Sequence, residues 1–218
     1  MAAVDGVLFD FGGIFTVSPF SVARESGLEV GLDVDVAMEL CFGPYHEDTD
    51  HPWHRLERGE MPFEDARRAL QDLAADRGIE IDPFTLLFGL AREDDLKDAV
   101  VGRALAVREA GVRTGLVTNN VAEFGDHWRR MVPIDDLFDV VIDSCEVGCR
   151  KPGERIYRLA LDAVGTHPGR TVFLDDHPAN VQAAEALGMM GIVVDDDRLA
   201  AFDALDALLG DGEDGRHA

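Results

Sequence analysis

Short hydrophobic runs that stop at polar residues recur along the chain. They occupy 7–9, 116–117, 140–142, 172–174 and 192–194, and amphipathic stretches lie between them. Uninterrupted apolar runs of this kind are typical of strands that are buried on both faces of a parallel sheet. Alternation of such strands with helices predicts an α/β fold, a Rossmann-like doubly wound parallel sheet.

Apolar residues with helical spacing fill the segments between these runs. Pro178 stands where one such helix would begin and Gly188 where it would end, and Gly111 takes the same closing position after an earlier one. The stretches predicted as helices are 96–107, 156–163 and 178–188.

The stretch 17–95 differs from the rest because it shows no strand-like alternation. An amphipathic helix begins after Pro62 and ends near Gly78, and 34–40 is part of another. A connection of this length is too long for an ordinary crossover. We therefore predict a core domain formed by 1–16 and 96–210 and an all-helical cap subdomain at 17–95. The acidic end of the chain should fray, with 211–218 as a disordered tail.

Composition narrows the functional classes. The chain has 43 Asp and Glu against 20 Lys and Arg, a formal net charge of −23, which excludes nucleic acids and anionic membranes as partners. Three cysteines cannot form a disulfide framework, and no leader peptide or membrane-spanning run is visible. We expect a soluble cytoplasmic protein, and the sequence does not predict its oligomeric state.

Polar residues with chemical potential follow four of the predicted strands. Asp10 follows the first, Thr118 and Asn119 follow the second, Lys151 comes in the loop after the third, and Asp175-Asp176 end the fourth. The carboxyl ends of parallel strands meet at one edge of a sheet. We expect these side chains to form a single site.

Four segments carry a resemblance to a known family. They are LFDFGGIFT (8–16), LVTNN (116–120), SCEVGCRKPGERIY (144–157) and VFLDDHPANVQAAEALGM (172–189). The chain resembles the haloacid dehalogenase (HAD) superfamily, in its phosphatase branch with a helical cap inserted after the first strand. The last two segments look most similar to the amino-terminal phosphatase domain of soluble epoxide hydrolases and to bacterial sugar-1-phosphate phosphatases. The resemblance implies a hydrolase of a small phosphorylated metabolite, for example a sugar phosphate.

Each candidate residue suits a step of phosphoryl transfer. A carboxylate at Asp10 can attack phosphorus and form an aspartyl-phosphate. The Thr118 hydroxyl, with Asn119 and nearby backbone N–H groups, can donate hydrogen bonds to the phosphoryl oxygens. Lys151 supplies a positive charge to the same group.

A metal ion completes this interpretation. Asp176, supported by Asp175, is expected to hold Mg²⁺ together with the Asp10 carboxylate and the Gly12 backbone carbonyl. Three carboxylates and a phosphate dianion bring about −5 of charge, and like charges 4 Å apart repel by about 4 kcal/mol even at an effective dielectric of 20. One lysine does not neutralise such a cluster, so we predict Mg²⁺ as cofactor.

Gly12 departs from the family pattern, which places a second aspartate there as general acid and base. Three interpretations stay open: the leaving group needs little protonation, a cap residue donates the proton, or catalysis is weak or absent. The cap candidates are His46, His51 or His54, with Glu57. A 2-haloacid dehalogenase-type reaction is a further alternative, but that branch lacks the paired aspartates found at Asp175-Asp176.

Overall fold

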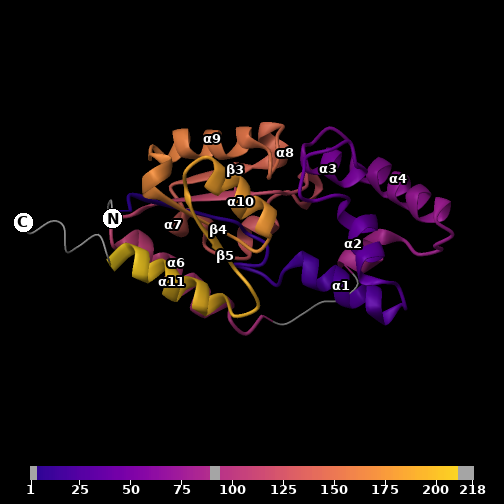
Figure 1. The fold of residues 1–218 in the computed structure, drawn as a ribbon, viewed down its shortest axis with the longest axis horizontal. Coiled ribbons are helices and arrows are strands. Elements are labelled where there is room, and N and C mark those ends of the chain that lie inside the picture. The colour runs from indigo at the N-terminus through magenta and orange to yellow at the C-terminus, as the bar shows by residue number, and fades with distance from the viewer. Residues whose placement is uncertain (1–3, 89–93, 211–218) are drawn as a thin grey trace, which may run out of the picture.

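The computed structural model describes residues 4–88 and 94–210. Its centre is one five-stranded parallel sheet with the strand order β3-β2-β1-β4-β5 (Figure 1). The strands are β1 (Gly6–Phe9), β2 (Arg113–Thr118), β3 (Val140–Asp143), β4 (Thr171–Asp175) and β5 (Met190–Val193). All five strand predictions, and with them the predicted α/β fold, are confirmed.

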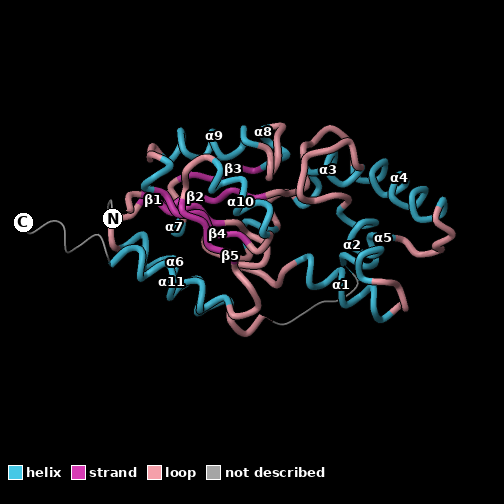
Figure 2. Tube along the Cα trace, in the orientation of Figure 1, coloured by secondary structure: helices cyan, strands magenta, loops and turns pink. Residues whose placement is uncertain are grey.

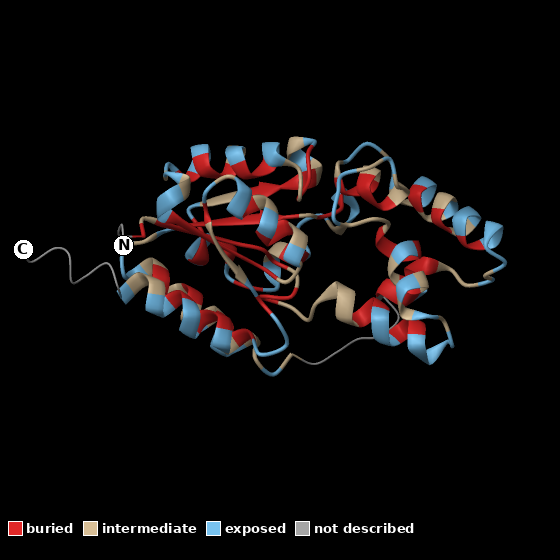
Figure 3. Cartoon of the chain, in the orientation of Figure 1, coloured by how far each residue is buried: buried red, intermediate tan, exposed pale blue. Residues whose placement is uncertain are grey.

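Helices cover both faces of the sheet because its central strand buries side chains on both sides. Val7 and Phe9 of β1 belong to one hydrophobic cluster and Leu8 to another, and all three are fully buried. Figure 3 colours most of the sheet between the helices as buried. The first cluster includes residues of α6 (Lys97–Glu109), α7 (Ile134–Leu137) and α11 (Arg198–Gly210). Beside the second cluster lie α8 (Ser144–Val147), α9 (Glu154–Val164) and α10 (Pro178–Ala186). Three short 3-10 helices lie at Ala122–Phe124, Trp128–Arg130 and Pro168–Arg170.

Between β1 and β2 the described residues form helices and loops but no strand (Figure 2). These helices pack on a third hydrophobic cluster of their own and lie at one end of the molecule, beyond the sheet. We call them the helical cap. They are α1 (Pro19–Glu29), α2 (Val34–Phe42), α3 (Pro52–Glu57), α4 (Phe63–Asp76) and α5 (Pro83–Phe88).

The last helix of the described chain lies just before the predicted tail. Residues 198–210 form α11, in which Phe202 and Leu205 are fully buried against the sheet cluster. Packing of its apolar face supplies most of the stability of such a helix, although its sequence is acidic. The predicted tail, 211–218, lies outside the described residues. Within the described part of the chain, no helix is long and apolar enough to cross a membrane.

Candidate active site

Asp10, Lys151 and Asp175 form a buried ionic cluster at the carboxyl edge of the sheet. The Lys151 Nζ lies 2.7 Å from Asp10 Oδ1 and 2.7 Å from Asp175 Oδ2. Lys151 and Asp175 have no exposed surface, and Asp10 is 8% exposed. A buried ammonium placed between two carboxylates is oriented by both of them, so the three groups act as one unit.

The register of the sheet explains how this cluster is assembled. β1 pairs with β4 so that Phe9 is opposite Leu174, and the Asp10 backbone N–H donates to the Leu174 carbonyl at 2.9 Å. Asp10 and Asp175 therefore leave adjacent strands at the same level. The Asp10 carboxylate also accepts a hydrogen bond of 2.7 Å from the Phe11 N–H, which holds its orientation.

Asp176 brings a third carboxylate to this cluster. Oxygen atoms of Asp10, Asp175 and Asp176 all lie within 4.8 Å of one another. Ser18, just before α1, donates its hydroxyl to one Asp176 oxygen, while Asp176 Oδ1 is buried and has no partner among residues 4–88 and 94–210. Gly13 packs so closely that a Cβ there would overlap the Asp176 carboxyl group.

The electrostatics of this cluster fit a cation. Burial, and then repulsion from Asp175, raises the pKa of Asp10 to about 7 against the attraction of Lys151. Burial, Asp175 and Asp10 together raise the pKa of Asp176 well above its ordinary value. An orphaned buried oxygen, a tight cradle and three hard carboxylate ligands suit a small divalent ion such as Mg²⁺.

Asn119 and Thr118 lie beside the cluster, but in different relations to it. Asn119 Oδ1 accepts from the Lys151 N–H at 2.8 Å, and its Nδ2 donates to the Lys151 carbonyl at 3.0 Å and to the Tyr45 hydroxyl at 2.9 Å. Its side-chain donors are thus used in positioning Lys151 and meeting the cap. Thr118 is the buried last residue of β2, next to β1 in the sheet.

A buried ion pair, which the sequence analysis missed, joins the cap to the core beside this site. Arg150 Nε donates to Glu57 Oε2 at 2.6 Å, and both side chains are almost wholly buried. Glu57 Oε1 accepts from Tyr45 at 3.1 Å and from Trp53 Nε1 at 2.7 Å. The Arg150 guanidinium lies 4.4 Å from the centre of the Tyr45 ring. Arg150 directly precedes Lys151 in the chain, so this contact between cap and core lies next to the lysine.

The cap histidines are not placed for proton transfer. His54 is fully buried, accepts from the Thr49 N–H at Nδ1, and has Nε2 2.8 Å from the Phe42 carbonyl, which makes it a neutral structural bridge. Burial lowers its pKa to about 3. His51 caps α3, burial lowers its pKa to about 4, and His46 is exposed. Glu57 alone among the four predicted cap candidates lines a cavity with Asp10.

That cavity runs from the carboxylates to the cap and has a volume of about 120 Å³. Gly12, Asp176 and Asn119 border it at the sheet edge, and aromatic rings of the cap close it. A Cβ at Gly12 would lie 3.2 Å from Pro19 Cδ, so this glycine also sets the approach of α1 to the site.

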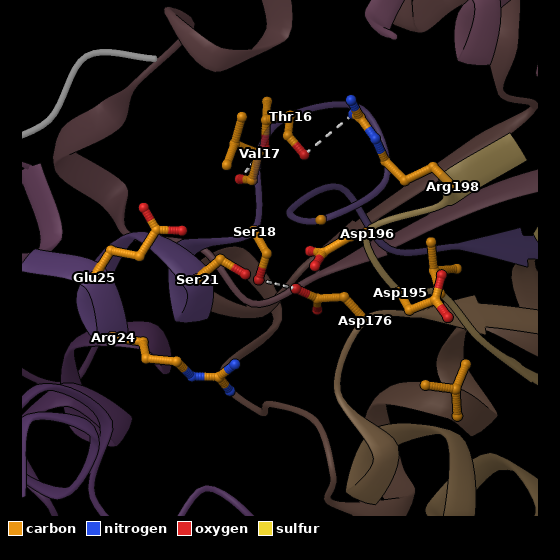
Figure 4. A pocket seen from close by; sticks show the side chains of 13 residues that line it. Thr16, Val17, Ser18, Ser21, Arg24, Glu25, Asp176, Asp195, Asp196 and Arg198 are labelled. Atoms are coloured by element: carbon orange, nitrogen blue, oxygen red, sulfur yellow. Dashed lines mark hydrogen bonds between the residues drawn. The ribbon is translucent and has the colours of Figure 1, made fainter. Parts of the chain in front are cut away.

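A second and larger cavity, of about 500 Å³, lies on the other side of Asp176 (Figure 4). Its walls come mainly from the start of the cap and the loop after β5. Arg198 at its edge donates to the carbonyls of Ile14 and Thr16 and pairs with Asp94. Arg198 thereby contacts both chain segments that connect the cap to the sheet, the one after β1 and the one before α6.

Comparison with known proteins identifies the family. A family model for haloacid dehalogenase-like hydrolases matches residues 4–188. The chain therefore belongs to this family, which confirms the resemblance seen in its four motif segments. It is a hydrolase, and phosphatases are among the proteins to which it is similar.

Three similar proteins illustrate this relationship. Mouse bifunctional epoxide hydrolase 2 is 38% identical over 200 residues, 85% of this chain and 35% of that protein. Sesquiterpene phosphatase astK of Aspergillus oryzae is 29% identical over 87% of this chain and 89% of its own length. A HAD family enzyme of Bacteroides thetaiotaomicron, solved as a magnesium complex, is 20% identical, with a TM-score of 0.59 and coverage of 89% and 96%. The chain spans about a third or less of the mammalian relatives that it matches.

Proposed function

We propose that this protein is a magnesium-dependent phosphatase acting on a small phosphomonoester, with Asp10 as its nucleophile. The observation that carries the proposal is the buried arrangement of Asp10, Lys151 and Asp175, with Asp176 adjoining them. The similarity to a sesquiterpene phosphatase over 89% of that protein supports a phosphate ester as substrate.

The reaction follows from the positions of these groups. The Asp10 carboxylate oxygen attacks phosphorus, the bond from phosphorus to the leaving oxygen breaks, and an aspartyl-phosphate forms. Water then attacks this intermediate, which releases inorganic phosphate and restores the carboxylate. Lys151 stays charged because Asp10 and Asp175 raise its pKa overall, although burial alone would lower it. Its ammonium orients Asp10 and offsets charge on the transferring group.

Asp10 and Asp176, with the Gly12 carbonyl and support from Asp175, would hold the Mg²⁺ ion. When bound, the ion neutralises charge on the carboxylates and on the phosphoryl oxygens. The magnesium complex of the Bacteroides HAD family enzyme supports this assignment, as does the orphaned oxygen of Asp176. Thr118 and backbone N–H groups of its loop are proposed to contact the phosphoryl oxygens.

Because residue 12 is a glycine, no side chain at this position can protonate the leaving group. Burial raises the pKa of Glu57 overall, and hydrogen bonds that it accepts from Arg150, Trp53 and Tyr45 offset only part of this rise. It is committed as an acceptor and does not serve as the acid. We therefore favour a leaving group that takes its proton from water.

We also propose the division into a core of 1–16 and 96–210 and a cap of 17–95, supported by the separate hydrophobic cluster of α1–α5. Cytoplasmic location remains part of the proposal. Its support is that Cys41, Cys145 and Cys149 are all free thiols, as expected in a reducing compartment.

A direct assay tests the proposed activity. Phosphate release from a panel of small phosphomonoesters is measured with Mg²⁺ or with excess EDTA, for the native chain and for Asp10→Asn. We expect release that depends on Mg²⁺ and disappears in Asp10→Asn. Asp195→Asn is the matched control, since Asp195 also follows a strand of this sheet but is exposed.

Other outcomes select other functions. Full turnover in excess EDTA would contradict the metal assignment. Halide release from 2-haloacids without metal would select the dehalogenase reaction. The absence of both activities would leave a HAD-fold binding protein.

A further inference from the structure

We propose that the site selects a short apolar leaving group, so that its substrates are alkyl, alkenyl or aryl phosphomonoesters rather than phosphates of sugars or other polyols. This inference rests on the proposed phosphatase function and assigns its substrate class.

The walls of the 120 Å³ cavity are the first observation. Beyond the carboxylates, most of its surface is formed by apolar side chains from α1, α2, α3, α5 and the 3-10 helix Ala122–Phe124. They are Pro19, Phe20, Phe42, Trp53, Leu87 and Phe124. The Phe20 ring lies 4.6 Å from that of Phe42 and 4.9 Å from that of Tyr45, so the aromatic surface is continuous. A group leaving Asp10 toward the cap meets this surface.

The few polar groups in these walls are the second observation. Asn119 uses both hydrogens of its amide on Tyr45 and the Lys151 carbonyl. The Tyr45 hydroxyl and Trp53 Nε1 both donate to Glu57. Every N–H and O–H donor of these side chains is therefore already used within the protein.

The two observations favour the same class of substrate. A hydroxyl group brought into this cavity gives up its hydrogen bonds to water and finds no free donor on Asn119, Tyr45 or Trp53, which weakens binding. A methylene group placed there is removed from water and strengthens binding by about fourfold. At about 120 Å³, this cavity is much smaller than the cavity of about 500 Å³ on the other side of Asp176. The leaving group that fits is thus short.

Binding of non-hydrolysable phosphonates tests this selectivity without any turnover. Calorimetry with Mg²⁺ present gives dissociation constants for methyl-, ethyl-, propyl-, butyl- and pentylphosphonate. We expect affinity to rise about two- to fourfold per methylene and then to level off. The matched ligand pair is butylphosphonate and 3,4-dihydroxybutylphosphonate, and we expect the diol to bind at least about tenfold more weakly.

A pair of variants assigns the effect to this cavity. Phe20→Ala should weaken butylphosphonate binding about tenfold and leave methylphosphonate within about twofold. Phe63→Ala is the control, because Phe63 packs on the same cap cluster but does not line the cavity. It should change neither constant.

The outcomes separate this inference from the proposed function. Affinity that does not grow with chain length, or a diol that binds as tightly as butylphosphonate, would overturn the inference. These ligand comparisons use the native chain, so they decide the question even if Phe20→Ala fails to fold. Efficient Asp10-dependent hydrolysis of sugar phosphates in preference to alkyl phosphates would leave the phosphatase standing and reject the apolar class. No turnover of any ester, alongside the expected phosphonate series, would reject the phosphatase alone.

Discussion

The sheet side and the cap side of the candidate active site differ in how far their polar groups are satisfied by hydrogen bonds and ion pairs. On the sheet side, three carboxylates lie at the carboxyl ends of the adjacent strands β1 and β4, Lys151 reaches them from the turn between α8 and α9, and one Asp176 oxygen has no partner among the described residues. On the cap side, Tyr45, Trp53 and Asn119 line the cavity among aromatic rings, and the hydrogens of their side-chain N–H and O–H groups are all used within the protein. The sheet wall keeps unsatisfied charge, whereas these three cap-side residues have satisfied their donors.

This difference indicates a division of labour. Charged groups that lack partners and are held by rigid strands are available to bind a metal ion and a phosphoryl group, because only such ligands satisfy them. A saturated wall offers shape and apolar area but few new hydrogen bonds. Chemistry is therefore assigned to the sheet and selectivity to the cap, and each of the following variants tests one side.

Removing the lysine should have the largest effect. Lys151→Met leaves Asp10 and Asp175 without their shared cation, and we expect kcat/KM for phosphate release to fall by about 10³-fold or more. Steady-state kinetics at saturating Mg²⁺ measure the loss. The control is Lys97→Met, which changes the only other lysine of the chain, at the start of α6. Comparable loss in both variants would contradict the special role of Lys151.

Breaking the cap-side ion pair should instead reduce stability. Glu57→Gln or Arg150→Met leaves a buried charge without its partner, which is expected to lower the free energy of unfolding by about 3 to 5 kcal/mol. The double variant should lose less than the sum of the two, as urea unfolding of all four proteins will show. Arg68→Met breaks the exposed Arg68–Asp65 pair of the same cap and should cost under about 1 kcal/mol. Additive losses would show that the two residues do not act as a pair.

The two glycines after Phe11 should respond differently to alanine. Gly13 has φ +73° and a Cβ there would overlap the Asp176 carboxyl group, so Gly13→Ala should weaken Mg²⁺ binding about tenfold or more. Gly12 has ordinary backbone geometry, and its nearest obstacle is Pro19 Cδ at 3.2 Å. Gly12→Ala should change Mg²⁺ affinity less than about threefold, measured by calorimetry. A larger loss at Gly12 than at Gly13 would contradict the Asp176 cradle.

The sheet wall could be predicted from the sequence for a physical reason. Parallel strands end at a common edge, so polar residues after apolar runs must gather there. Asp10, Lys151, Asp175 and Asp176 were found in this way, and the structure brings them together.

The cap wall could not be predicted because it depends on contacts between distant segments. Glu57 and Arg150 are 93 residues apart, and no local pattern tells which face of α3 meets the loop before Lys151. The segments WHRLERGE and CRKPGERIY contain Glu57 and Arg150, respectively. Both charged residues are therefore visible in the sequence, but nothing in it indicates that they pair. The same holds for Arg198, which contacts Asp94 and Ile14. These residues precede it in the chain by 104 and 184 positions.

A pH series on the cap should give the smallest effect. Burial lowers the pKa of His54 to about 3, so the folded protein leaves this imidazole neutral while the unfolded chain protonates it below its ordinary pKa of about 6.5. Its contribution to stability is therefore complete above about pH 6.5 and is lost as pH falls toward 3. At pH 5.5 the loss is about 1.4 kcal/mol. His54→Gln keeps one donor and one acceptor for Phe42 and Thr49 but does not titrate. Urea unfolding at pH 7.5 and 5.5 should show the native chain losing about 1 kcal/mol more than His54→Gln, whereas parallel losses would mean that His54 is protonated in the folded cap.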